Sequence, residues 1–208
     1  MTNIPGGWDR PEVAEAQRVL VLGELCNSDT LPFKAFVDAM NSAGLRSGNL
    51  LDVGCGVGHY GILCERHFPV IRYHGTDASQ AMIDEARLLA PLCYFEVCEF
   101  ESNAFGNYDI VLASQVIEME GDAWDKLCLL LATAKRYVVL NRIRLTPEKS
   151  HQITESTYCG HTGYNWLWNM AEIEAEIARH GKVLYKDVYA NGGQAIYVIG
   201  VNYGKRSI

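Results

Sequence analysis

The stretch between residues 50 and 61 constrains the fold of this chain more than any other feature. It reads LLDVGCGVGHYG: an apolar run ends at Asp52, and three glycines follow at alternate positions, Gly54, Gly56 and Gly58. Glycines spaced in this way allow a tight turn in which bare backbone N–H groups face a ligand. The helix after such a turn directs its N-terminus at an anionic group. The pattern therefore predicts a strand, a glycine turn and a helix that together contact an anionic ligand group.

A second motif lies downstream of this turn. Residues 75–86 read GTDASQAMIDEA, so Asp77 ends an apolar run and Ser79 precedes a helical pattern. Together with D-x-G-x-G-x-G at 52–58, the run D-x-S-x-x-M-x-x-x-A at 77–86 resembles the cofactor-binding motifs of the class I S-adenosylmethionine-dependent methyltransferases. Residues 108–118 resemble the same family's pattern F-D-x-V-x-x-x-x-V-L-E-H, with Met119 in place of the histidine. The resemblance covers residues 49–143.

The hydrophobic pattern predicts alternating strands and helices. Strands are expected at 49–53, 70–76, 93–98, 108–113 and 137–143, and helices at 58–67, 80–89 and 123–134. Such alternation implies a parallel sheet covered on both faces. Because few residues separate the third strand from the fourth, their crossover helix is expected to be short or missing. A helix at 170–180 should end at Gly181 as a C′ glycine, and strands at 182–189 and 194–203 should form a hairpin through the turn 190–193.

These patterns give a fold class and a domain organisation. We expect an α/β fold with a doubly wound, mostly parallel sheet. The resemblance implies seven strands in the order 3-2-1-4-5-7-6, an antiparallel C-terminal hairpin and helices on both faces. Amphipathic helices at 11–26 and 31–43 precede the first strand, so residues 1–45 should form a helical cover and residues 46–208 the core. The aromatic segment 144–168 shows neither strand nor helix pattern, which predicts a lid or an acceptor-site loop.

Composition narrows the function classes. The net charge is −7, from 25 acidic and 18 basic residues, and a bulk electrostatic nucleic-acid partner is therefore not expected. The start of the chain has no signal-peptide pattern, and no apolar run is long enough to cross a membrane. Seven cysteines occur without a C-x-x-C pair, so we expect reduced thiols in a cytoplasmic protein, with no metal site. The oligomeric state cannot be read from the sequence.

The resemblance implies that these motifs bind S-adenosylmethionine. Asp52 would orient the amino group of the cofactor, and the backbone of the turn would lie against its methionine part, at Gly54, Cys55, Gly56 and Gly58. Asp77 would accept hydrogen bonds from both ribose hydroxyls, which are strong because the acceptor is charged. Ala78 and Met82 would pack near the adenine. A tight strand-to-helix turn that binds nothing, and a purely structural role for Met82, are the alternatives.

The ends of the third and fourth strands complete the implied site. Glu99 would accept a hydrogen bond from the adenine amine, and the backbone N–H of Phe100 would meet a ring nitrogen. The family more often has aspartate at the first of these positions, and a solvated loop carboxylate is the alternative. Ser114 and Gln115 end the fourth strand, beneath the expected position of the sulfonium. For Glu118, a loop carboxylate and a role in acceptor binding are both open.

The acceptor and the catalytic base are less well defined. We expect methyl transfer to an O, N or C nucleophile of a small or medium-sized molecule. His151 and His161 are weak candidates for a base, because their segment follows the fifth strand and open α/β sheets bind ligands at the carboxyl ends of their strands. Each is also compatible with a surface or packing histidine. His59, at the start of a helix, is expected near the methionine end of the cofactor rather than as a base.

Two other functions fit parts of the sequence. Residues 56–61 satisfy G-x-G-x-x-G and Asp77 follows about twenty residues later, as in an NAD(P)-dependent oxidoreductase. Asp52 with Gly54, and the serine and methionine after Asp77, favour the methyltransferase instead. The third possibility is a non-catalytic S-adenosylmethionine-binding partner subunit, which predicts an exposed apolar face on the N-terminal helices.

Overall fold

The computed structural model describes residues 8–26, 30–119, 122–156 and 162–202. Its helices are α1 (Pro11–Cys26), α2 (Leu31–Ser42), α3 (His59–His67), α4 (Gln80–Leu89), α5 (Ala123–Thr133) and α6 (Met170–His180), with 3-10 turns η1 (Phe100–Ser102) and η2 (Phe105–Asn107). Its strands are β1 (Gly48–Val53), β2 (Ile71–Asp77), β3 (Tyr94–Val97), β4 (Ile110–Ser114), β5 (Tyr137–Thr146), β6 (His151–Ser156), β7 (Thr162–Asn169), β8 (Gly181–Tyr189) and β9 (Gln194–Val201). The two short turns replace the crossover helix between β3 and β4, as predicted.

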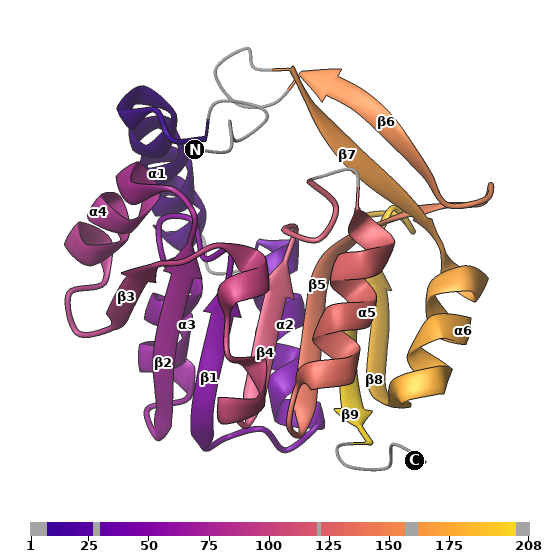
Figure 1. The fold of residues 1–208 in the computed structure, drawn as a ribbon. Coiled ribbons are helices and arrows are strands. Elements are labelled where there is room, and N and C mark those ends of the chain that lie inside the picture. Colours follow the sequence, from indigo (N-terminus) through magenta and orange to yellow (C-terminus); the bar gives the residue numbers. More distant parts are fainter. Residues whose placement is uncertain (1–7, 27–29, 120–121, 157–161, 203–208) are drawn as a thin grey trace.

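The sheet has the predicted fold class with an addition. Its central part runs β3-β2-β1-β4-β5 in parallel, and β9 then pairs antiparallel with both β5 and β8. Within the described residues, these seven strands in the order β3-β2-β1-β4-β5-β9-β8 correspond to the predicted order 3-2-1-4-5-7-6. The extra pair β6 and β7 joins the sheet through a short parallel pairing of β7 with the end of β5. The carboxyl ends of the parallel strands share one edge (Figure 1).

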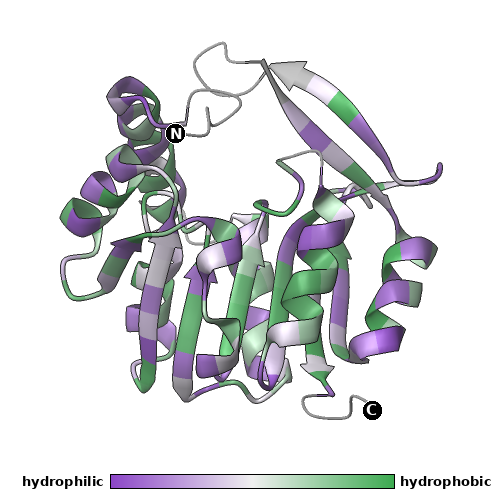
Figure 2. Ribbon diagram, viewed as in Figure 1, coloured by the Kyte–Doolittle hydropathy of each residue, from purple (hydrophilic) through white to green (hydrophobic). Residues whose placement is uncertain are grey.

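Helices cover both faces of the sheet. Successive strand residues face opposite sides, so Leu50 belongs to the buried cluster that includes residues of α1, α2, α3 and α4, while Leu51 belongs to the cluster that includes residues of α5 and α6. Val139 and Leu140 divide in the same way on β5. Figure 2 shows the central strands largely in the hydrophobic colour. Burial on both faces explains why these strands read as continuous apolar runs rather than as alternating ones.

The prediction of an irregular segment at 144–168 is wrong. β5 continues to Thr146, and β6 and β7 form an antiparallel hairpin whose register pairs His151 with Leu167. The hairpin rises beyond the carboxyl edge of the sheet (Figure 1). On β7, Asn165 and Trp168 are buried and Tyr164 is exposed. Aromatic and β-branched residues favour a strand. Polar residues between them interrupt the apolar pattern, so the sequence did not predict these strands.

The glycine that ends α6 has a different role from the predicted one. Gly181 adopts φ −175°, which is extended rather than left-handed, and β8 begins at this residue. A Cβ there would lie 2.3 Å from the backbone oxygen of Gly200 on the neighbouring strand. The position therefore requires glycine because two backbones approach closely. The hairpin of β8 and β9 that follows it was predicted correctly.

Candidate active site

The glycine turn after β1 has the backbone conformation that its sequence predicts. Gly54, Gly56 and Gly58 have φ of 69°, 52° and 78°, all in the left-handed region that L side chains rarely adopt. A Cβ at Gly54 would lie 2.3 Å from the side chain of Val116, and one at Gly58 would lie 2.6 Å from Phe95. The spacing of the glycines thus serves both the turn and its close packing against β3 and the segment after β4.

Asp77 connects this turn to the end of β2. Its carboxylate accepts a hydrogen bond from the backbone N–H of Gly56 at 2.9 Å and another from the N–H of Ser79 at 2.9 Å. Burial raises the pKa of Asp77, and these two N–H donors oppose that shift. Ser79 also caps α4, since its hydroxyl accepts from the N–H of Met82 at 3.2 Å. The carboxylate is therefore held in place by two segments of backbone.

A cavity opens at the carboxyl edge of the sheet above this contact. It is lined by residues from five parallel strand ends, the N-terminal segment and α5: Trp8, Gln17, Val53, Gly54, Cys55, Gly56, His59, Asp77, Ala78, Ser79, Met82, Cys98, Glu99, Phe100, Glu101, Ser114, Gln115, Val116, Met119, Lys126 and Arg142. Open α/β sheets bind ligands in this place. Mixed apolar and polar linings of this kind are typical of small-molecule sites.

The cavity is acidic at one end and has a cation at the other. Asp77, Glu99 and Glu101 line it near β2 and β3, whereas Arg142 lines it near β5. His59 lies between the glycine turn and this arginine. Burial, and secondly the positive charge of Arg142, lower the pKa of His59 to about 3, so its imidazole is neutral at physiological pH. Its Nδ1 is buried and has no hydrogen-bond partner among the described residues.

Asp52 lies beneath the turn rather than in the cavity. Its carboxylate is buried and accepts a hydrogen bond from the hydroxyl of Tyr73 at 2.5 Å. Burial raises the pKa of Asp52 to about 7, although the Tyr73 hydroxyl partly offsets this. In this structure Asp52 supports the floor of the turn.

Comparison with known proteins agrees with this geometry. Residues 51–129, which include the glycine turn and Asp77, match the family described as a methyltransferase domain. Trans-aconitate 2-methyltransferase of Enterobacter sp. (strain 638) is 32% identical over 95 residues, which is 44% of this chain and 37% of that protein. The matched region thus spans just over a third of that relative's length.

Solved structures share the whole architecture. An amino pentose methyltransferase from Micromonospora echinaspora with bound S-adenosylmethionine superimposes with a TM-score of 0.63 at 15% identity, over 88% of this chain and 96% of that one. Residues 51–129 thus match a methyltransferase domain, and the chain has the fold of solved methyltransferases. A Haloferax volcanii complex that contains the Trm112 methyltransferase activator also matches, with a TM-score of 0.63 at 15% identity over 92% and 96% of the two chains.

The fold brings most of the residues expected from this methyltransferase resemblance to one cavity. Ten of them line it: Gly54, Cys55, Gly56, Asp77, Ala78, Met82, Glu99, Phe100, Ser114 and Gln115. Gly58 instead caps α3. His151 lies on β6, does not line the cavity, and pairs its Nδ1 with the carbonyl of Lys149 at 2.8 Å. His161 lies outside the described residues.

Several residues that line the cavity were not predicted. Gln17 reaches it from α1 because that helix packs on α4, and its Oε1 is buried without a hydrogen-bond partner among the described residues. No motif marks such a position. Arg142 lies within the predicted fifth strand at 137–143, and its position near the carboxyl end of that strand was the available signal. Lys126 comes from α5, beside the ring of Phe100.

Glu118 is a buried carboxyl group next to the cavity-lining Met119. Burial raises the pKa of Glu118 to about 8, and Trp168 and the charge of Arg144 only partly offset that effect. The group is therefore largely protonated at neutral pH, which suits a structural or hydrogen-bonding role.

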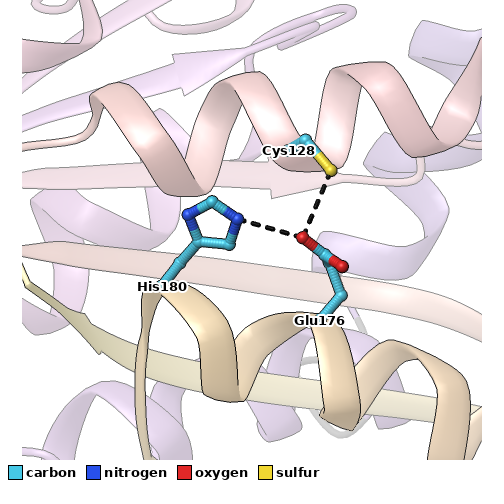
Figure 3. Close-up of side chains that lie close together, drawn as sticks. All are labelled: Cys128, Glu176 and His180. Atoms are coloured by element: carbon cyan, nitrogen blue, oxygen red, sulfur yellow. Dashed lines mark hydrogen bonds and ion pairs between the residues drawn. The ribbon is translucent and has the colours of Figure 1, made fainter. Parts of the chain in front are cut away.

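A cysteine, a glutamate and a histidine also lie together away from the cavity (Figure 3). Glu176 on α6 accepts hydrogen bonds from the Cys128 thiol on α5 at 3.4 Å and from His180 at 3.0 Å. Its second oxygen is 3.1 Å from Arg179. Because both oxygens of the carboxylate already have hydrogen-bond donors, we interpret this cluster as a structural contact that holds α5 against α6.

Proposed function

We propose that the protein uses S-adenosylmethionine to methylate an O, N or C nucleophile of a small or medium-sized acceptor. The observation that carries the proposal is the double backbone hydrogen bond of Asp77, which holds a ribose-binding carboxylate beside the glycine turn. The match of residues 51–129 to the methyltransferase family supports the same reaction class.

The chemistry of the cavity lining fits this cofactor. Asp77 offers carboxylate oxygens to ribose hydroxyls, and Glu99 offers them to an exocyclic amine. Met82 and Phe100 provide apolar surface for adenine. Gly56 has no side chain to stand between the backbone of the turn and a ligand, and it also lines the cavity. When bound, S-adenosylmethionine supplies a methyl group that its sulfonium makes electrophilic.

The chain's own contribution is to position the reactants. Gln115, directly after β4, has a left-handed conformation with φ 54° and lines the cavity. Ser114 shares a hydrogen bond of 2.9 Å with the hydroxyl of Tyr60, which in turn accepts from Asn141 at 2.8 Å. This buried network fixes the floor. Holding an acceptor atom in line with a methyl group supplies much of the acceleration that such a reaction needs.

A screen of acceptor pools with methyl-labelled S-adenosylmethionine tests the proposal. We expect labelled product from the wild-type protein and at least tenfold less from Asp77→Asn. Label transfer that does not require Asp77, or binding of NAD(H) in place of the cofactor, would contradict the proposal.

One observation favours the alternative of a non-catalytic, S-adenosylmethionine-binding partner subunit. On α1, Val19, Leu20 and Leu22 are 59%, 49% and 38% exposed, which gives this helix an apolar outer face. The Haloferax volcanii neighbour was solved with an activator protein. Light scattering of the purified chain, with and without Leu20→Glu, tests whether this face associates. This alternative requires tight S-adenosylmethionine binding without turnover by the isolated chain.

A further inference from the structure

An irregularity in the middle of β5 places one arginine in the cavity. The pairing of β5 with β9 shifts register between Leu140 and Ile143, and Arg142 within this bulge adopts φ 58°. Its N–H donates to Asn141 Oδ1 at 2.9 Å and to the Tyr189 hydroxyl at 3.1 Å. A bulge redirects a side chain out of the regular alternation of a strand. The buried polar network thus maintains an unfavourable conformation whose effect is to direct Arg142 into the cavity.

The surroundings of the guanidinium suit an anionic ligand. The Arg142 side chain is only 16% exposed, and its guanidinium lies 5.6 Å from the centre of the Phe33 ring. Glu24, which lies 3.5 Å from the guanidinium, is 41% exposed, so solvent weakens that interaction. A guanidinium has five N–H donors in a planar fork, so it can bind a second carboxylate as well as Glu24. The adjacent His59 contributes no competing charge.

The order of the strands separates Arg142 from Asp77 and the glycine turn, whereas Ser114 and Gln115 lie at the end of the neighbouring β4. Asp77 ends β2 and the glycine turn follows β1, whereas Arg142 lies on β5, beyond β4. Neighbouring strands are about 4.8 Å apart, so β5 is roughly 10 Å from β1. Asp77, Glu99 and Glu101 outnumber Lys126 at the β2–β3 end of the cavity, so that end would repel an anion, whereas Arg142 would attract one at the β5 end.

We propose that Arg142 binds a carboxylate or phosphate group of the methyl acceptor, so that the acceptor of this enzyme is a small anion. The inference rests on the proposed methyltransferase function. The carboxylate of the cofactor's methionine part is the other possible source of the same charge, and the experiment below distinguishes the two.

Calorimetry and thermal shift with small anions test the inference. Succinate, citrate and inorganic phosphate are titrated into protein saturated with S-adenosylhomocysteine at constant ionic strength, with succinamide as the neutral match. We expect at least one anion to bind, at least tenfold weaker binding to Arg142→Gln, and an intermediate effect of Arg142→Lys, which keeps the charge but loses the fork. Glu24→Gln should strengthen anion binding by about twofold to fivefold. Arg136→Gln, an exposed arginine just before β5, is the matched control and should change nothing.

Three results would overturn the assignment. The first is that no anion binds the wild-type protein, and the second is that Arg142→Gln binds anions as well as the wild type does. The third is a tenfold loss of S-adenosylhomocysteine affinity in Arg142→Gln, because that result would assign the arginine to the cofactor. If Arg142→Gln unfolds, Arg142→Lys and Glu24→Gln still decide, because they predict changes of opposite sign. A wild-type protein that binds no S-adenosylhomocysteine would refute the proposed function instead.

Discussion

Asp77 accepts a hydrogen bond from the backbone N–H of Gly56, 21 positions earlier in the chain, at 2.9 Å. This contact connects the ends of two adjacent parallel strands, β1 and β2, at the cavity. The same carboxylate also accepts from Ser79 at the start of α4. One side chain therefore fixes both the turn and the position at which a ribose would bind.

Replacing Asp77 by asparagine should weaken cofactor binding strongly. The asparagine amide keeps one acceptor oxygen, but its NH2 group would face a backbone N–H that needs an acceptor. The substitution also removes the negative charge that strengthens the hydrogen bonds from Gly56 and Ser79. We expect the Kd for S-adenosylhomocysteine to rise at least tenfold, a loss of about 1.4 kcal/mol or more. Calorimetry measures this. Asp84→Asn, on the exposed side of α4, is the control and should leave the Kd unchanged.

Gly56→Ala should abolish binding through the turn. The alanine would have to adopt φ 52° and place its Cβ 2.7 Å from Gln17 Oε1. The conformational cost alone is about 1–2 kcal/mol. Gly44→Ala separates that cost from the effect on the site, because Gly44 has φ 70° with no heavy atom within 4 Å of the added Cβ. Both variants should lose stability on chemical denaturation, but only Gly56→Ala should lose S-adenosylhomocysteine binding; equal affinities would contradict the assignment of the turn.

Glu118→Gln should alter the pH dependence of stability. The folded state raises the pKa of Glu118 from 4.5 to about 8, so it binds more protons than the unfolded state within this window. The contribution of Glu118 to the free energy of unfolding is therefore fully present below pH 4.5 and is lost as the pH rises through about 8. A neutral glutamine removes that loss. We expect the variant to be more stable than the wild type at pH 9, by up to about 5 kcal/mol, as measured by urea unfolding; equal pH slopes for the two proteins would refute this.

His59 should remain neutral across the physiological range. Its pKa is lowered from 6.5 to about 3 in the folded state, so the unfolded state binds more protons between these values. Stability is therefore lost as the pH falls from 6.5 towards 3. NMR of the imidazole C–H signals should show no titration of His59 between pH 8 and 5. The Arg142→Gln variant removes the positive charge that helps to lower the pKa of His59, so this pKa should rise in the variant. A titration midpoint of His59 near pH 6.5 in the wild-type protein would contradict its buried environment.

The sequence predicted those parts of the molecule that depend on local pattern. The bounds of α1, α4 and α6 agree with the periodicity, and Ser79 caps α4 as its position before Gln80 indicated. The turn was predictable because only glycine readily adopts its φ values. The conformation of Arg142 was not predictable, because it depends on a register shift between β5 and β9. The presence of Gln17 in the cavity likewise depends on the packing of α1 against α4.

The central claim is that the turn at 54–58 and Asp77 together bind an adenosyl sulfonium compound. Calorimetric titration of the purified chain with S-adenosylhomocysteine, and separately with NAD⁺, tests it most directly. The account predicts one bound S-adenosylhomocysteine per chain and no heat from NAD⁺. Binding of NAD⁺ alone, or no binding of either compound to the folded protein, would contradict it.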